Sequence, residues 1–407
     1  MKRAALLALL VSLLACTTAA PPAKPFVVDD ATRGAIAQLE EAVAQQPKNT
    51  PWIYILATYY DRAHDAANVV KWLTRLDELG WDHGIPPHDF RNTNTTAFRD
   101  VAARLDAREP LVHKAETAFT LANHRDLIPE GITYDPVDDV FYVSSIYHRN
   151  VVRIDRRGRA TDFLPEAAHG MLSSLGMHVD AKRRLLWVAS SAAEEMVGYT
   201  PELQGRSILF AFDLRDGSIV KQFAIGSPNQ PSMLNDLTIL ADGSVLVTDT
   251  VRNQVLRTAA DVDTLDAWLD DFRFPNGITA TDDGKTLYVA DFRGITRVSL
   301  ADGKREPIET NTIMNGIDGL SMHRGNLIGI QNAIGRARVV RIGADSGRVE
   351  ILESKNPLFE VPTTGVVVGD EFYFIANPGL RSFEEHKLWP KSRLKDPVML
   401  RIPLVSS

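Results

Sequence analysis

Residues 235–250 read NDLTILADGSVLVTDT, and residues 276–291 read NGITATDDGKTLYVAD. Each segment starts with two small or polar residues, continues into an apolar stretch, turns at an Asp-Gly pair and returns as a second apolar stretch. Two short apolar stretches separated by such a turn are typical of a β-hairpin. Because the pattern recurs, we interpret both segments as copies of one structural repeat.

Four further segments follow a similar pattern, with Asp or Gly at the turn: residues 130–145 (EGITYDPVDDVFYVSS), 175–190 (LGMHVDAKRRLLWVAS), 318–332 (DGLSMHRGNLIGIQN) and 364–377 (TGVVVGDEFYFIAN). Successive starts of the six segments are 45, 60, 41, 42 and 46 residues apart. Repeats of about 40–50 residues with several strands each indicate a β-propeller, in which ring closure buries the faces of every sheet. We therefore predict a mainly β fold, with a six-bladed propeller over residues 114–404.

The last repeat is one strand short, because apolar strand patterns follow its start only at residues 366–375 and 398–404. The segment ETAFTL, Glu116 to Leu121, precedes the first repeat and has the pattern of a strand. We predict that it completes the last blade and closes the ring.

Residues 29–110 carry a helical pattern instead. Ile36, Leu39 and Val43 recur at spacings of three and four, Asp30 is the expected N-cap, and Gly80 is placed at the end of a later helix. A further helix is expected over Thr96 to Leu105. Short helices joined by Asn, Pro and Gly turns resemble one or two tetratricopeptide-like units, which are too few to bury much by stacking. This segment is expected to pack on the next domain or to present a groove to a protein partner.

The chain begins with the charges of Lys2 and Arg3 and the apolar run Ala4 to Ala15. This run is shorter than the roughly 20 residues that span a bilayer, so it indicates a secretory signal. It ends at Cys16, the only cysteine, in a context that resembles a bacterial lipobox. We expect a lipoprotein signal peptide over residues 1–16 with a lipidated Cys16, and a tether over residues 17–28. The alternative is an ordinary signal peptide with an incidental thiol.

Lipidation implies a membrane anchor in the cell envelope. Thr17 follows the cysteine, where an aspartate would resemble an inner-membrane retention signal. The expected location is therefore the outer membrane, facing the periplasm.

The charge balance and the missing motifs exclude several classes of function. The chain has 45 Lys and Arg and 52 Asp and Glu, a net charge of −7, which argues against nucleic acid as a partner. It contains no G-x-S-x-G or H-E-x-x-H motif and no Gly-rich phosphate loop. The chain therefore lacks the motifs of nucleophile-elbow serine hydrolases and of zinc proteases.

The first residue of a repeat carries an oxygen donor in four repeats: Glu130, Asn235, Asn276 and Asp318. In a propeller, the innermost strands start near the axis at a shared height, so these side chains are expected to converge. Two carboxylates and two amide oxygens suit calcium or magnesium, whereas zinc sites prefer histidine and cysteine. We predict one divalent cation, calcium, held by these four residues. The competing interpretation is that each residue belongs to an ordinary turn pair.

These motifs carry a resemblance: residues 114–404 look like the regucalcin/gluconolactonase (senescence marker protein-like) family of six-bladed propellers, which is related to the paraoxonases. The matching motifs are Glu130-Gly131, Asn235-Asp236, Pro275-Asn276-Gly277 and Asp318-Gly319. The resemblance implies a cation on the axis and the hydrolysis of a lactone or related ester, with Asp318 as ligand and also as base or nucleophile. The helical segment lies outside the resemblance.

Three further residues have expected roles. Asp236 is a candidate support for the ligands, or else a solvated carboxylate at a strand start. His178 is a candidate proton shuttle, as the paraoxonase relation suggests, or else a structural histidine. Many sugar-lactonase relatives carry an arginine two residues before the equivalent of Asn235, but here the residue is Met233. This difference implies a less polar lactone or ester as substrate.

Two functions of different classes remain open. The first is a calcium-dependent hydrolase of the lactonase or esterase type. The second is a non-catalytic, metal-stabilised propeller that acts as a binding scaffold or a small-molecule sensor in the cell envelope.

Overall fold

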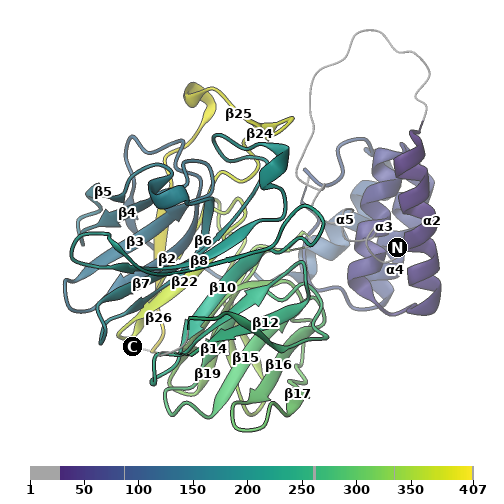
Figure 1. Cartoon of the computed structure of the whole chain (residues 1–407). Helices are drawn as coiled ribbons and strands as arrows, with labels where there is room; N and C mark the ends of the chain where they lie inside the picture. Colours follow the sequence, from purple (N-terminus) through teal and green to yellow (C-terminus); the bar gives the residue numbers. More distant parts are fainter. Residues whose placement is uncertain (1–27, 87, 260–262, 334, 406–407) are drawn as a thin grey trace. The chain divides into compact units, whose positions relative to one another are not determined.

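The computed structural model describes residues 28–86, 88–259, 263–333 and 335–405 (Figure 1). The described chain forms two compact units, one made of the residues up to Leu111 together with residues 333–336, and the other of the rest. The predicted signal peptide, Cys16 and most of the tether lie outside the described residues, so these remain predictions. Within the described part of the chain, no helix has the length and apolar character needed to cross a membrane.

The first unit contains the helices α2 (Asp30–Gln45), α3 (Thr50–Arg62), α4 (Ala66–Glu78) and α5 (Thr96–Arg108). Each helix starts after a polar N-cap whose side chain accepts a backbone N–H, and the caps are Asp29, Asn49, Asp65 and Thr95. The first cap is Asp29 rather than the predicted Asp30, because Asp29 Oδ1 accepts Thr32 N at 2.7 Å. Helix α3 packs against both α2 and α4, and nearly all of its residues are buried. The tetratricopeptide-like description is therefore only approximate.

The second unit is the predicted six-bladed propeller, and every blade is a four-stranded antiparallel sheet. The strands of blades 1 to 3 are β2 (Pro129–Asp135), β3 (Val140–Ser145), β4 (Val151–Ile154), β5 (Ala160–Leu164), β6 (Ser173–Asp180), β7 (Leu185–Ser191), β8 (Ser207–Asp213), β9 (Ile219–Ile225), β10 (Leu234–Ile239), β11 (Val245–Asp249), β12 (Gln254–Thr258) and β13 (Asp266–Leu269). The strands of blades 4 and 5 are β14 (Ile278–Ala280), β15 (Thr286–Asp291), β16 (Gly294–Ser299), β17 (Arg305–Pro307), β18 (Ile317–His323), β19 (Asn326–Gln331), β20 (Arg338–Gly343) and β21 (Val349–Ser354).

Blade 6 combines the two ends of the propeller. Its strands are β22 (Gly365–Val368), β23 (Glu371–Ile375), β26 (Val398–Pro403) and β1 (Glu116–Thr120), with a small hairpin of β24 (Phe383–Glu384) and β25 (Lys387–Leu388) inserted after β23. Strand β1 pairs antiparallel with β26, so that Glu116 lies opposite Arg401. The prediction that residues 116–121 complete the last blade is confirmed.

A separate hydrophobic cluster fills each of the six interfaces between neighbouring blades, including the interface between blades 6 and 1. In β3, Phe141 and Val143 face blade 6, whereas Val140 and Tyr142 face blade 2. Successive residues of a strand point to opposite faces, and here both faces are buried. This explains why the second strand of each repeat is a continuous apolar run.

The inner strands approach each other so closely at the axis that the glycine at the second position of a repeat has little room for a side chain. A Cβ atom on Gly131 would lie 2.3 Å from the carbonyl oxygen of Leu175 in the next blade. A Cβ atom on Gly277 would lie 2.5 Å from the carbonyl oxygen of Asp318. Neither glycine has a left-handed φ, so close packing rather than backbone conformation requires glycine here.

We predict that Gly131→Ala lowers the stability of the propeller by about 1–3 kcal/mol, because the added methyl group overpacks the contact between blades 1 and 2. Thermal unfolding followed by circular dichroism measures the effect. The control is Gly34→Ala in α2, where an added Cβ has nothing within 4 Å and the propeller transition should not move. An unchanged melting temperature for Gly131→Ala would contradict this account of the axis.

Candidate functional site

Four of the six inner strands begin with a β-bulge at the same place. In β2, Pro129 lies opposite Ser145 and Ile132 opposite Val143, so one extra residue is accommodated between them. The same offset occurs at residues 174–177, 234–237 and 317–320 of β6, β10 and β18. Bulges redirect side chains and are common beside active sites. They show that the first residues of these repeats are equivalent in structure as well as in sequence.

Asp318 is the centre of the contacts near the axis. The side-chain amide of Asn276 donates to Asp318 Oδ1 at 2.5 Å, and the side-chain amide of Asn332 donates to Asp318 Oδ2. The carboxylates of Glu130 and Asp236 lie close enough for the charge of Asp318 to raise the pKa of each. The structure therefore brings residues from blades 1, 3, 4 and 5 together.

Asn235 joins this group through Thr250. Its side-chain nitrogen donates to Thr250 Oγ1 at 3.1 Å, and Thr250 Oγ1 donates to the carbonyl oxygen of Pro275 at 2.7 Å. Since Pro275 precedes Asn276, these bonds tie two predicted ligands to each other. Both asparagines use their amide nitrogen in these contacts, so the side-chain carbonyl oxygen of each is the atom that could bind a ligand.

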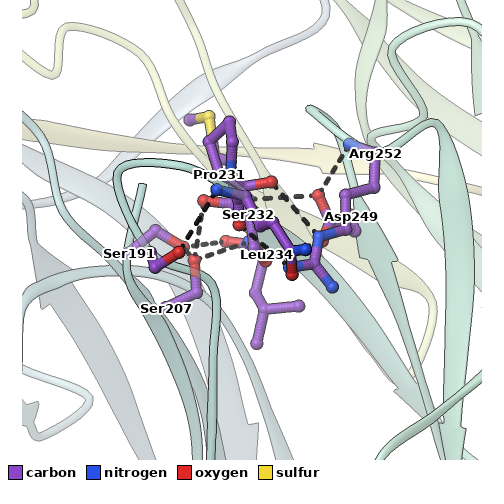
Figure 2. A network of polar contacts seen from close by, with 10 residues as sticks. Ser191, Ser207, Pro231, Ser232, Leu234, Asp249 and Arg252 are labelled. Atoms are coloured by element: carbon purple, nitrogen blue, oxygen red, sulfur yellow. Dashed lines mark hydrogen bonds and ion pairs between the residues drawn. The ribbon is translucent and has the colours of Figure 1, made fainter. Parts of the chain in front are cut away.

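A buried polar network fixes the chain leading to Asn235 (Figure 2). Asp249, at the end of β11, accepts the hydroxyl of Ser232 at 2.6 Å and the backbone N–H of Met233 at 3.1 Å. From blade 2, Ser191 donates its hydroxyl to the carbonyl oxygen of Leu234 at 2.8 Å. The backbone is therefore held on both sides immediately before the bulge of blade 3.

Side chains at the equivalent strand ends of blades 4 and 5 also bond to the backbone that leads into an inner strand. Asp291, the last residue of β15, accepts the backbone N–H of Arg273 at 3.0 Å. Gln331, the last residue of β19, donates to the carbonyl oxygen of Asn315 at 2.6 Å. Each of these side chains fixes the segment that leads into an inner strand and so sets the height of its first residue.

The sequence analysis missed Thr250 and Asn332. Both are the last residues of the repeats as quoted, and each follows the end of a second strand by one residue. Each one bonds to the first residue of its own repeat. An alignment of the repeat ends, in addition to the repeat starts, would have shown these two polar side chains in register.

Burial raises the pKa values of all three carboxylates, and the charge of Asp318 raises those of Glu130 and Asp236 further. Burial raises the pKa of Glu130 well above its usual value, and the charges of Asp318 and Asp236 raise it further. Burial also raises the pKa of Asp236, to about 7, although backbone N–H groups favour its ionised form. The pKa of Asp318 is raised by burial, against the opposing effect of its two amide donors. Such a cluster binds protons or a cation more readily than isolated carboxylates do.

The residues present fit a hard divalent cation. Glu130 is only 7% exposed, and its Oε2 atom has no hydrogen-bond partner among the described residues. An unpartnered buried carboxylate oxygen costs free energy unless a positive charge satisfies it. Within the described chain, no three His, Cys, Asp or Glu side chains are grouped so as to hold an ion by themselves. A cation here would therefore depend on the amide oxygens of Asn235 and Asn276, and a set of oxygens alone suits calcium.

The two remaining predicted residues have different surroundings. Asp236 is half-buried and links blades 3 and 4, because its Oδ2 accepts the backbone N–H of Ile278 at 3.2 Å. His178 is reached by solvent, yet desolvation by the surrounding protein lowers its pKa, so it is largely neutral at pH 7. Among the described contacts, none joins His178 to the three carboxylates. Its role as a proton shuttle stays a prediction.

The fold and this set of residues define a six-bladed β-propeller with an acidic, oxygen-rich site at its axis. A family model described as the SMP-30/gluconolactonase/LRE-like region matches residues 128–359, more than half of the chain. The match includes all four residues at the repeat starts that were predicted as ligands. The chain belongs to the SMP-30/gluconolactonase/LRE-like family.

Solved structures with this fold have several activities. A gluconolactonase from Xanthomonas campestris is 17% identical with a TM-score of 0.50, and the match covers 71% of this chain and 89% of that one. A PQQ-bound aldose sugar dehydrogenase from Streptomyces coelicolor is 12% identical with a TM-score of 0.50, and the match covers 72% of this chain and 99% of that one. Such distant likenesses show the fold alone, which does not determine the reaction. No curated protein matches the chain.

We predict that Glu130→Gln raises the melting temperature of the chelator-treated protein at pH 8. The pKa of Glu130 is raised on folding, so its ionisation destabilises the folded state increasingly as the pH rises above the unfolded-state pKa. The expected gain is about 2–4 °C for each kcal/mol of repulsion removed, and it shrinks toward zero near pH 5. Thermal unfolding in EDTA at both pH values measures it. A variant less stable than the wild type at pH 8 would contradict the clustering of these carboxylates.

Proposed function

We propose that the protein is a lactonase-type hydrolase that depends on one divalent cation, calcium, at the propeller axis. The observation that carries the proposal is the convergence of the Glu130, Asp236 and Asp318 carboxylates, with Glu130 Oε2 lacking a hydrogen-bond partner among the described residues. Membership of the SMP-30/gluconolactonase/LRE-like family supports the lactonase type of chemistry.

Glu130, Asn235, Asn276 and Asp318 would hold the cation through oxygen atoms, and Asp236, Thr250 and Asn332 would keep those side chains in place. When bound, a divalent cation polarises a carbonyl group and lowers the pKa of a neighbouring water molecule. The chain's own residues supply orientation and proton transfer. Asn276 and Asn332 each hold one oxygen of Asp318, so its carboxylate has a fixed direction.

Asp318 is the proposed general base. Burial raises its pKa, which makes the ionised carboxylate a better proton acceptor near neutral pH. In the reaction, the oxygen of a water molecule bonds to the carbonyl carbon of the lactone while Asp318 takes one proton from that water. The ring C–O bond then breaks, and the departing oxygen receives the proton. The product is the open-chain hydroxy acid, and Asp318 returns to its ionised state.

Met233 supports a less polar substrate than a sugar lactone. It stands two residues before Asn235, where many sugar-lactonase relatives carry an arginine, and a thioether offers no donor to a hydroxyl or carboxylate group. Its side chain is half-buried, and its backbone is fixed by Asp249. We therefore propose a hydrophobic lactone or ester as the substrate.

We predict that Asn235→Ala and Asp318→Ala fold normally but lose both calcium binding and turnover. The loss of a direct ligand should weaken calcium binding by more than the roughly 10–100-fold that the loss of a supporting residue costs. Isothermal titration calorimetry measures the affinity, and a panel of lactones and aryl esters measures turnover. The matched control is Asp345→Ala in the β20–β21 turn of blade 5, because that side chain is 96% exposed and pairs only at the surface with Arg297.

Chelation of the wild-type protein should abolish turnover, and restored calcium should recover it. Turnover that persists in EDTA would contradict metal dependence. If the protein binds calcium but turns over no member of the panel, the proposed hydrolase activity is contradicted and a metal-stabilised binding protein is favoured.

A further inference from the structure

Two threonines where β11 ends bond to consecutive residues of the next blade. Thr248 and Thr250 are two residues apart, a spacing at which side chains of an extended chain share one face. The hydroxyl of Thr250 donates to the carbonyl oxygen of Pro275 at 2.7 Å. The hydroxyl of Thr248 lies 3.0 Å from the carbonyl oxygen of Asn276, to which it can donate. Blade 3 therefore holds the backbone that leads into blade 4.

Both hydroxyls also accept a hydrogen bond from the inner strand of their own blade. Thr250 Oγ1 accepts the side-chain amide of Asn235 at 3.1 Å, and Thr248 Oγ1 accepts the backbone N–H of Asp236 at 3.1 Å. A hydroxyl can donate one hydrogen bond and accept others, so each threonine connects the inner strands of blades 3 and 4. Thr248 is fully buried, and no solvent competes for its hydroxyl.

Asn253 adds a third contact between the same two segments. Its Oδ1 atom accepts the backbone N–H of Phe274 at 2.9 Å, and its carbonyl oxygen accepts the backbone N–H of Phe272 at 3.1 Å. Asn253 has a φ of +59°, a left-handed conformation in which asparagine is enriched. With the two threonines, blade 3 thus bonds to each of the three consecutive residues 274–276.

The backbone that these contacts hold is strained. Phe274 has a φ of +52°, which is an outlier for a bulky residue, and it directly precedes Pro275, which restricts it further. Ile128, which precedes the proline before Glu130, has a φ of +47°. Such conformations persist only where the surrounding structure enforces them, and they cluster at functional sites. At Phe274, the bond from its N–H to Asn253 supplies part of that constraint.

The turn that carries Asn253 is itself fixed within blade 3 (Figure 2). Asp249 accepts the backbone N–H of Arg252 at 3.0 Å. The guanidinium group of Arg252 donates to the carbonyl oxygens of Pro231 at 3.2 Å and Gln230 at 3.0 Å. The turn is therefore tied to the chain that leads to Asn235, and a displacement of Asn253 would disturb these bonds.

We propose that Thr248 and Asn253 are positioning residues that, together with Thr250, set the position of Asn276 relative to Asn235 at the propeller axis. The proposal deepens the proposed function and rests on it, because it concerns the separation of two proposed calcium ligands. Neither Thr248 nor Asn253 is itself a proposed ligand, and both act through the backbone of residues 274–276. Loss of either contact should weaken calcium binding while every proposed ligand stays in the chain.

The first test compares Thr248→Val with Thr248→Ser in the full chain. Valine keeps the branched shape of threonine without its hydroxyl, and we expect it to weaken calcium binding about 10–100-fold, the range for supporting residues. Serine keeps the hydroxyl and should retain most of the affinity. Isothermal titration calorimetry measures both variants. An unchanged affinity in Thr248→Val, or an equal loss in Thr248→Ser, would overturn the proposal.

The second test compares Asn253→Gly with Asn253→Asp. Glycine adopts the left-handed φ without strain but lacks the oxygen that accepts the N–H of Phe274. Aspartate tolerates the same φ and keeps an acceptor oxygen. Asn253→Gly should bind calcium about tenfold more weakly, and Asn253→Asp at least as tightly as the wild type. No loss in Asn253→Gly, or the same loss in both variants, would contradict the role of Asn253.

Thr133→Val is the matched control for general destabilisation. Thr133 is only 2% exposed and accepts the backbone N–H of Val179 in the next blade at 3.2 Å, so its hydroxyl also joins two inner strands. It lies three residues after Glu130, about 10 Å further along the strand. Thr133→Val should lower the melting temperature about as much as Thr248→Val but leave calcium affinity unchanged. An equal loss of affinity would show that loosening any inner strand suffices and would overturn the proposal.

A readout without calcium separates this inference from the proposed function. The side-chain amide signal of Asn276 in nitrogen-15 NMR spectra of the calcium-free protein is assigned by its loss in Asn276→Ala. It should shift or broaden in Thr248→Val and Asn253→Gly but not in Thr133→Val, and an unchanged signal in the first two variants would contradict the inference. If the wild-type protein binds no calcium, the proposed function fails, and this comparison still decides whether Thr248 and Asn253 position Asn276.

Discussion

The close approach of the inner strands at the propeller axis is the constraint on which the site depends. Gly131 and Gly277 lack side chains where the backbone of the next blade passes, with as little as 2.3 Å from a hypothetical Cβ to a neighbouring carbonyl oxygen. Glu130 and Asp318 directly precede the closely packed Gly131 and Gly319, and the charge of Asp318 raises the pKa of Glu130.

The gathering of carboxylates at the axis destabilises the fold electrostatically, and the packing of the blades must compensate. Hydrophobic clusters at all six interfaces, together with the pairing of β1 and β26, hold the ring closed while its axis gathers carboxylates that repel one another. A bulge and a polar strand end recur where the chain approaches the axis; in blade 3, Asp249 holds Ser232, which lies shortly before Asn235. Bulges, buried polar side chains and clustered carboxylates would each weaken an isolated sheet. Their occurrence together at the axis is consistent with a binding site.

The sequence predicted the ring, its closure by residues 116–121 and the shared level of the repeat starts, because repeat spacing and alternation follow directly from blade geometry. It did not reveal Asn332, whose role depends on how a strand end folds back toward Asp318. The first helix cap was placed one residue late, since Asp29 and Asp30 are both acidic and only geometry distinguishes them.

A crystal structure of the protein with calcium, recorded at a wavelength that reveals calcium by anomalous scattering, tests the central claim most directly. The account predicts one peak on the propeller axis, about 2.3–2.6 Å from oxygen atoms of Glu130, Asn235, Asn276 and Asp318. A peak elsewhere, or an axis without calcium at saturating concentration, would contradict it.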